Sequence, residues 1–260
     1  MAEKLFLYID ILGFKHLVQS GYDVMSIYQD INDLNVHSDQ DFKAIVFSDT
    51  IIVHASEMWN AAPNQGLMWL TEFAQDLFYR LISKDIHIRA YITYGDFHHH
   101  EMENVQAYYG EALIICYERE KKIKSTGVFI DSRLVPHCDI FKTTKFNDES
   151  HYVHVMQHLD QISFAYESYP IEGSYVEATG MEWWIAYLLR YLENTFKHSQ
   201  DPALPNEVRL KHATAWKMLS AQHAGLTTRL VEAEFDFAKV IQLDWSEPLR
   251  RIGTAEGAWS

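Results

Sequence analysis

The stretch FLYIDILGF, residues 6–14, constrains the fold of this chain more than any other segment. Its first residues are apolar, and several are β-branched or aromatic, which is typical of a strand buried within a sheet. The run then reaches Asp10, and the pair Gly13-Phe14 follows shortly after. A buried strand has no use for a carboxylate at its end unless something there needs negative charge. We therefore expect a buried strand over residues 4–10 that ends at a functional aspartate.

A second aspartate lies between two β-rich runs, 43–47 and 50–55, which are separated only by Ser48-Asp49. Two polar residues between apolar runs indicate a hairpin. If the first strand pairs antiparallel with this hairpin, Asp10 and Asp49 meet at one edge of the sheet. Neighbouring carboxylates repel unless a cation or proton intervenes, and Mg²⁺ favours carboxylates combined with substrate phosphates. The alternative is structural, with Asp10 capping a helix and Asp49 serving as a turn residue.

The remaining pattern predicts an α+β fold. Helical periodicity covers 15–35, with an interruption at Gly21, and then 66–83 and 110–123; strands are expected at 86–94, 127–131 and 151–156. Beyond about Tyr169 the pattern becomes helical, over 181–196 and 206–242, and the last dozen residues are expected to fray. We divide the chain into a core at 1–165 and a mostly helical C-terminal extension at 166–260.

The net charge of −14 argues against a broad basic face, and therefore against nucleic acid as a partner. An acidic protein can still bind a polyphosphate when a metal ion lies between the two. The two cysteines, Cys116 and Cys138, have no pair or cluster spacing, which fits a reducing compartment. No apolar run approaches the ~18 residues of a membrane span, and the N-terminus has no cleavable signal pattern. We expect a cytoplasmic protein without a membrane partner.

Four segments, IDILGF, FSDTIIV, RAYITYG and YYGEALIICYERE, resemble in this order the sequence blocks of the class III nucleotidyl cyclase domain. The resemblance spans about residues 4–135 and is closer to the pyrimidine cyclases of bacterial anti-phage systems, often called Pycsar. Members convert UTP or CTP to a 3′,5′-cyclic monophosphate, which activates a separate effector. The resemblance implies a ferredoxin-like core, with an antiparallel-rich sheet and helices on one side.

The resemblance also implies roles for individual residues. Asp10 and Asp49 match the aspartates that bind two Mn²⁺ or Mg²⁺ ions per active site, and Ile11 matches the position that lends a backbone carbonyl to the second metal. Gly13 and Phe14 match the loop whose amides hold the β- and γ-phosphates. In this superfamily the site is shared between protomers, so a homodimer is implied.

Several positions depart from the family pattern. The lysine that reads a purine base falls at Ile45, and the asparagine and arginine that steady the transition state fall at Ile114 and Glu118. Arg89 is our candidate for the missing cation or for a base contact, and its alternative is a surface arginine at a strand end. Two functions of different class stay open. One is a cyclase that makes cyclic UMP from UTP, or cyclic CMP from CTP, with pyrophosphate; the other is a catalytically silent domain that binds nucleotide or a partner protein.

Other polar clusters are interpreted as structural or solvated. Adjacent histidines on an extended segment point to alternate sides, so at most two of His98-His99-His100-Glu101 converge on a metal, and we prefer a solvated dimerisation arm. We also interpret Asp39, Asp41, Lys121, Lys122 and Lys124 as solvated residues. Trp183, Trp184 and Cys116 are interpreted as packing residues. Lys142 and Lys145 are guesses for phosphate-contacting lysines.

Overall fold

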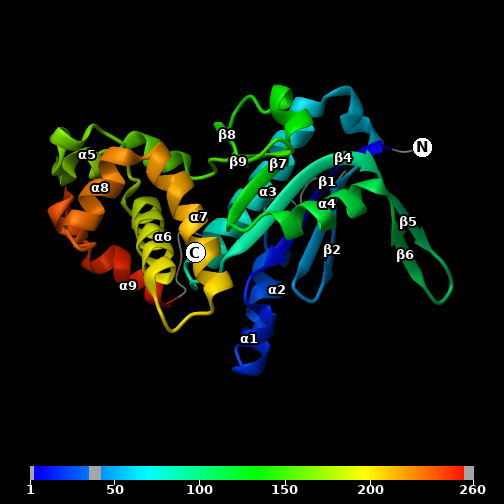
Figure 1. Cartoon of the computed structure of the whole chain (residues 1–260), viewed down its shortest axis with the longest axis horizontal. Coiled ribbons are helices and arrows are strands. Elements are labelled where there is room, and N and C mark those ends of the chain that lie inside the picture. The colour runs from blue at the N-terminus through cyan, green and yellow to red at the C-terminus, as the bar shows by residue number, and fades with distance from the viewer. Residues whose placement is uncertain (1–2, 35–41, 255–260) are drawn as a thin grey trace. The chain divides into compact units, whose positions relative to one another are not determined.

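The computed structural model describes residues 3–34 and 42–254. The chain forms two compact units. The first contains residues up to 78 together with 86–155, and the second contains 79–85 together with the residues from 156 onward. Each unit is described by itself below, with the elements labelled as in Figure 1.

A seven-stranded sheet forms the centre of the first unit, in the order β2-β3-β1-β4-β7-β9-β8. Neighbouring strands are antiparallel except for β4 and β7, which run parallel. The strands are β1 (Glu3–Ile11), β2 (Phe42–Phe47), β3 (Thr50–Ala55), β4 (Ile88–Asp96), β7 (Gly127–Asp131), β8 (Thr143–Lys145) and β9 (Ser150–Val153). The α+β prediction is confirmed, and β1 is the predicted first strand. Its five consecutive buried residues, 5–9, explain why its sequence is almost continuously apolar.

Among the described residues, four α-helices belong mainly to the first unit. They are α1 (Phe14–Gln19), α2 (Val24–Asn32), α3 (Pro63–Ile82) and α4 (Glu111–Lys122). The expected interruption at Gly21 occurs, because this glycine adopts a φ of +76° between α1 and α2.

Helices α3 and α4 lie on opposite faces of the sheet. A Cβ on Gly66 of α3 would meet the side chain of Leu5, whereas a Cβ on Gly95 of β4 would meet Ala112 of α4. Gly95 pairs with Lys4, and neighbouring residues of a strand point to opposite faces. The expectation of helices on one side of the sheet is therefore wrong for this pair, because α4 packs on the face opposite to α3.

A two-stranded hairpin projects from the first unit as a separate sheet (Figure 1). It pairs β5 (His98–Glu101) with β6 (Gln106–Tyr109), in the segment expected to be a dimerisation arm. The sequence analysis did not predict these strands, because their polar and histidine-rich residues carry no apolar alternation. We call this hairpin the arm.

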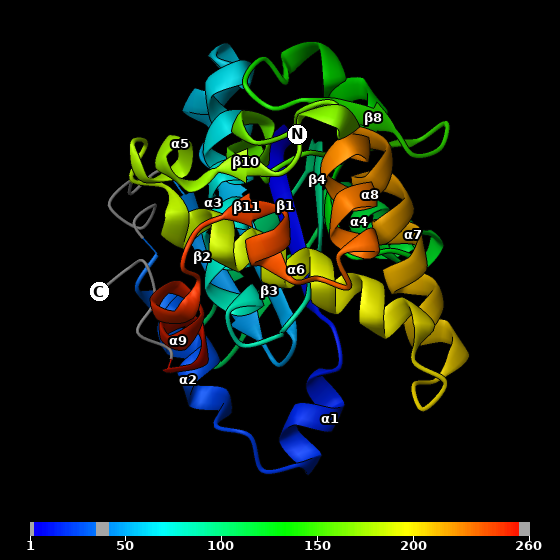
Figure 2. The same ribbon diagram turned by 90° about the vertical axis from the view of Figure 1, so that its left-hand side faces the viewer.

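The second unit is mostly helical, as expected for the C-terminal residues. Its elements are α5 (Gly173–Glu177), α6 (Glu182–Gln200), α7 (Asn206–Gln222), α8 (Ala224–Glu232) and α9 (Ser246–Thr254), with the short strands β10 (Ile171–Glu172) and β11 (Ile241–Gln242). The two short strands pair in parallel (Figure 2). Short 3₁₀ turns in the two units lie at Glu57–Ala61, Ser132–His137, Gln157–Gln161, Tyr166–Ser168 and Phe237–Lys239.

Two predictions for this unit are wrong in part. The helix expected over 206–242 is broken at His223, where φ is −120° and ψ is 44°, and the helical residues end at Glu232. The expected fraying from about residue 249 is contradicted as far as Thr254, where α9 ends, and residues 255–260 lie outside the described residues. Within residues 3–34 and 42–254, no helix is both long and apolar enough to span a bilayer.

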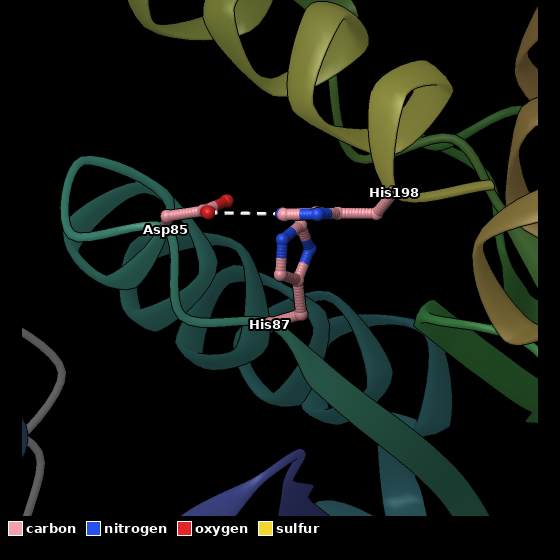
Figure 3. A group of neighbouring side chains, drawn as sticks. All are labelled: Asp85, His87 and His198. Carbon is pink, nitrogen blue, oxygen red and sulfur yellow. Dashed lines mark hydrogen bonds and ion pairs between the residues drawn. The ribbon is translucent and has the colours of Figure 1, made fainter. Parts of the chain in front are cut away.

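Asp85, in the turn after α3, is bound to α6 inside the second unit. His198 Nε2 lies 2.9 Å from Asp85 Oδ2 (Figure 3). Asn194 Nδ2 also donates to Asp85 Oδ1 at 2.8 Å. The hydrogen bond to Asp85 raises the pKa of the His198 imidazole. Two side chains of one helix therefore hold this turn, where Asp85 itself has a φ of +54°.

Candidate active site

Asp10 lies near the end of β1, between two neighbouring strands. It pairs with Thr50 of β3 on one side and with Arg89 of β4 on the other. Cross-strand partners project to the same face, so the three side chains form a row across the sheet. Asp10 is partly exposed, with 19% of its side-chain surface accessible. Because Asp10 lies near the end of the strand, its carboxylate can reach solvent even though the five residues before it are buried.

Asp49 lies in the tight turn that joins β2 and β3. The predicted hairpin is confirmed, since Phe47 pairs with Thr50 and only Ser48-Asp49 lie between them. Ser48 takes a φ of +57°, and positive φ is a feature of the turns that fit two-residue hairpins. The amide of Ile11 donates to the Asp49 carbonyl at 2.9 Å, which fixes the turn against the end of β1. The hairpin thus carries Asp49 to the strand end that holds Asp10.

The phenol of Tyr8 lies within the electrostatic reach of both carboxylates. Burial is the main cause that raises its pKa, and the negative charges of Asp10 and Asp49 raise it further. The Tyr8 hydroxyl also lies 3.3 Å from Thr50 Oγ1. Asp10 pairs with Thr50, the residue after Asp49, and Ile11 is hydrogen-bonded to the Asp49 carbonyl, so the two aspartates share one region of the sheet. The expected meeting of the two aspartates therefore agrees with the geometry, while their roles stay predictions.

Arg89 is almost entirely buried beside Asp10. Its Nη2 lies 2.8 Å from Asp10 Oδ2 and also forms an ion pair with Glu120 of α4, and its Nη1 donates to the Ile123 carbonyl at 2.9 Å. The alternative of a surface arginine does not fit this burial. Sequence reasoning missed Glu120, because its link to Arg89 exists only after α4 has packed on the sheet.

The donor set of the two aspartates fits a hard divalent cation. Both are oxygen donors at one strand end, and Mg²⁺ and Mn²⁺ prefer carboxylate and carbonyl oxygens to nitrogen or sulfur. Arg89 contacts Oδ2 of Asp10, and a carboxylate has two oxygens with about four lone-pair sites, so this ion pair is compatible with metal binding. Asp10, Asp49 and the Ile11 carbonyl are the groups that would hold the ions.

Gly13 and Phe14 lie just beyond β1, after Leu12, in the loop where the sequence predicts amides that hold phosphate. Gly13 has a φ of +76°, which favours glycine, and it is exposed before the first turn of α1. Phe14 instead turns into the protein, where it is 7% exposed and its ring lies 6.4 Å from that of Tyr28. Any contact from this loop to phosphate therefore comes from its backbone amides and not from the phenylalanine side chain.

A groove of about 800 Å³ opens beside this strand end, between the β2–β3 hairpin and α4. Tyr8 and Thr50 line it, so it reaches the row that contains Asp10. Its full lining comprises Tyr8, Ile45, Val46, Phe47, Thr50, Ile52, Tyr108, Leu113, Ile114, Tyr117, Glu118 and Lys121. Pockets of this size and apolar character are typical of small-molecule sites. We call it the α4 groove.

Three positions singled out in the sequence face the α4 groove. Ile45, at the purine-reading position, lines it, as do Ile114 and Glu118 at the transition-state positions. The Ile45 side chain has no hydrogen-bonding group for a base. Glu118 places a negative charge at the position where the cyclase sequence pattern has an arginine. Tyr8, Thr50 and Tyr117 were not identified from the sequence, and their only signal was their spacing from Asp10, Asp49 and Ile114.

The other polar clusters take the following places. His98 and His100 share one face of the arm with Tyr109, and His99 stacks with Tyr108, so alternation along the strand is confirmed. Lys122 contacts Glu149, Lys145 contacts Asp148, Trp183 packs beneath Arg251, and Cys116 is fully buried. Asp39 and Asp41 lie outside the described residues.

No family model and no curated protein matches this chain. Solved structures of nucleotide cyclases are similar to it in fold. A bacterial light-regulated adenylyl cyclase has a TM-score of 0.45 and 9% identity, over 59% of this chain and 52% of that chain, so the match spans about half of its length. The adenylyl cyclase CyaB from P. aeruginosa has a TM-score of 0.41 and 10% identity, over 58% and 93% of the two chains. A guanylate cyclase domain from Catenaria anguillulae, solved with GTP, has a TM-score of 0.43 and 9% identity, over 58% and 96%.

Proposed function

We propose that this protein is a nucleotide cyclase that converts UTP to 3′,5′-cyclic UMP and pyrophosphate. The observation that carries the proposal is the arrangement of Asp10 and Asp49 at one strand end, beside a groove large enough for a nucleotide. Two carboxylates held together in this way suit a cation-bound polyphosphate better than they suit structural turns. The four sequence blocks of the first half of the chain support the same assignment.

The reaction is an internal displacement at phosphorus. The ribose 3′-oxygen bonds to the α-phosphorus, the bond from the α-phosphorus to its bridging oxygen breaks, and pyrophosphate leaves with the electron pair while the hydroxyl proton passes to solvent. Divalent cations bound at the site supply positive charge that lowers the pKa of the 3′-hydroxyl and neutralises the triphosphate. Asp10 and Asp49 would hold those ions and would thereby orient the reacting groups, and the α4 groove shields the nucleoside from water.

Two features favour a pyrimidine base. Ile45 in the α4 groove provides no hydrogen-bond donor for a purine edge, and the apolar lining suits a small base held by packing. Uracil presents O4 as an acceptor where cytosine presents an amino donor, and UTP is preferred to CTP because of the overall family likeness. In this proposal the cyclic product activates a separate effector in anti-phage defence.

The active unit is a homodimer with two shared sites. Large apolar side chains around the α4 groove are exposed in the single chain, with Phe47 79%, Ile114 60% and Tyr117 52% accessible. A contiguous exposed apolar patch on a water-facing surface is a mark of an interaction site. A second copy of the chain covers this patch in the proposed dimer.

One observation favours a second candidate, a catalytically silent nucleotide-binding domain. Ile114 and Glu118 line the α4 groove where a cyclase needs hydrogen-bonding and positive groups. Retention of the paired aspartates favours the enzyme, because a silent domain has no chemical need for them.

The test is incubation of the purified protein with Mn²⁺ and each of the four ribonucleoside triphosphates, with the products read by mass spectrometry. We expect cyclic UMP and pyrophosphate, and loss of at least 99% of the product in Asp49→Ala with the fold unchanged by circular dichroism. Cyclic CMP instead would reassign the base. A folded protein that binds triphosphate and makes no cyclic product would favour the silent domain.

A further inference from the structure

We propose that the ammonium group of Lys121 binds the negatively charged polyphosphate in the α4 groove. This inference rests on the proposed function. Cyclisation leaves pyrophosphate and concentrates negative charge around the α-phosphorus. Enzymes of phosphoryl transfer place a side-chain cation against that charge in addition to metal ions. In this chain the arginine and asparagine positions of α4 hold Glu118 and Ile114, so another residue has to supply it.

Among the described residues that line the groove, Lys121 is the only cationic side chain. The other cations of α4, and Arg89 on the neighbouring strand β4, have other partners. Arg119 and Lys122 form ion pairs with Glu149, and Arg89 is buried against Asp10 and Glu120. The groove therefore has one positive group.

Helical spacing places Lys121 on the groove side of α4. Ile114, Tyr117 and Lys121 stand at positions i, i+3 and i+7, which share one helix face, and all three line the groove. Lys121 is one turn further along the helix than Glu118. The lysine stem is long and flexible, so a shift of one turn is within the range of its ammonium group.

Tyr117 holds the ammonium group over its ring. Lys121 Nζ lies 3.6 Å from the centroid of the Tyr117 ring, which is a cation–π contact. This contact keeps the charge against the groove wall and not in bulk water. Because a cation–π contact at an exposed site is weak, about 0.5–1 kcal/mol, a phosphate group can draw the ammonium away from the ring.

Lysine in place of arginine also changes the chemistry. An ammonium is a compact charge with three rotatable donors, whereas a guanidinium is a planar fork. Lys121 therefore acts by charge, and arginine at the same position preserves that charge. Removal of the charge weakens polyphosphate binding and slows turnover together.

The experiment compares Lys121→Ala, Lys121→Arg and the matched control Lys122→Ala, whose lysine lies on the same helix against Glu149. Two readouts are taken: the affinity for 3′-deoxy-UTP with Mg²⁺ by calorimetry, and kcat for cyclic UMP formation. The analogue lacks the attacking hydroxyl, so binding is measured without turnover. Circular dichroism checks that each variant is folded.

We expect Lys121→Ala to bind the analogue at least five-fold more weakly and to lose about 10²-fold in kcat, the size expected for one charge-stabilising group. Lys121→Arg is expected to stay within five-fold of the wild type, and Lys122→Ala within two-fold. Lys121→Ala equal to Lys122→Ala in both readouts overturns the inference, while wild-type turnover still supports the proposed function. A wild type that makes no cyclic product contradicts the proposed function, and the binding readout then decides the inference about Lys121.

Discussion

Arg89 illustrates how one buried charge organises its surroundings. Its guanidinium lies between Asp10 of β1 and Glu120 of α4, and it also donates to the Ile123 carbonyl. The two carboxylates compensate the buried positive charge of the guanidinium, and the Ile123 carbonyl accepts one of its hydrogen bonds. The arginine therefore connects the end of α4 to the carboxylate of the candidate site. Its expected contact with a base stays a prediction.

Loss of the Arg89 charge is expected to destabilise the protein. Arg89→Met leaves Asp10 and Glu120 facing each other without a cation, and breaking a buried pair typically costs about 3–5 kcal/mol. We expect a fall of about 3 kcal/mol in the free energy of unfolding, measured by urea denaturation. The control is Arg250→Met, because the Arg250 and Glu247 side chains are 55% and 52% exposed, and an ion pair between exposed side chains has little effect on stability. Equal losses in the two variants would contradict this interpretation of Arg89.

His54 is expected to make the protein sensitive to acid. Burial lowers the pKa of the His54 imidazole to about 4, and the positive charge of Lys4 adds to this effect. The unfolded chain binds a proton near pH 6.5 and the folded chain only near pH 4, so stability falls as pH decreases through this range. The loss between pH 7 and pH 4 is about 3 kcal/mol.

The check is the free energy of unfolding of wild type and His54→Leu at several pH values. Leucine suits the site, since the His54 ring packs 5.0 Å from that of Phe97. The difference between the two proteins is expected to change by about 3 kcal/mol from pH 7 to pH 4. The control variant is His16→Gln, on an exposed part of α1. A constant difference between wild type and His54→Leu would rule out the proposed origin of the acid sensitivity.

At the level of elements, the start of α4 depends on one glycine. Gly110 has a φ of +151°, and a Cβ added there would lie 2.8 Å from Phe97 Cα and collide with the Asp96 carbonyl. These are backbone atoms, so no side chain can move aside. The close approach of α4 to the end of β4 therefore requires glycine, and α4 carries one wall of the groove.

Gly110→Ala is expected to lower the free energy of unfolding by roughly 2–3 kcal/mol, from strained backbone and overpacking. The control is Gly21→Ala, where φ is +76° but nothing lies within 4 Å of the added Cβ. That variant pays only the conformational penalty of about 1 kcal/mol. Thermal and urea unfolding measure both. If Gly21→Ala were as harmful as Gly110→Ala, the steric explanation would fail.

The elements that the sequence predicted well are those with strong periodicity. The hairpin around Ser48-Asp49, the helix α3 and the strand β7 were expected from apolar spacing and were found. The arm was missed because its histidines and tyrosines have no apolar alternation. The break at His223 was missed because the helical pattern continues on both sides of it, although Gly225 lies two residues beyond. In the site, the row of Thr50, Asp10 and Arg89 follows from strand register, which only the folded sheet fixes.

For the whole molecule, we expect the exposed apolar patch beside the groove to control assembly. Phe47→Asp places a charge at a side chain that is 79% exposed in the single chain and is covered in the proposed dimer. Light scattering after size exclusion is expected to give twice 30.4 kDa for the wild type and 30.4 kDa for the variant. Because the sites are shared, cyclase activity is expected to fall with the dimer.

The control for assembly is Leu210→Asp on α7, which is 50% exposed in the second unit. It changes the surface charge by the same amount and is expected to leave the mass and the activity unchanged. A wild type that is monomeric at assay concentration, or a Phe47→Asp variant that stays dimeric, would contradict the assignment of this patch.

The measurement that tests the central claim most directly is the binding of Mn²⁺ itself, because it depends on neither the correct base nor an activating signal. Electron paramagnetic resonance of free Mn²⁺ is followed while wild type, Asp10→Asn, Asp49→Asn or the exposed control Glu177→Gln is added. We expect the wild type and the control to bind equally, and each aspartate variant to bind at least ten-fold more weakly. Equal affinity in all four proteins would show that the paired aspartates are not a metal site.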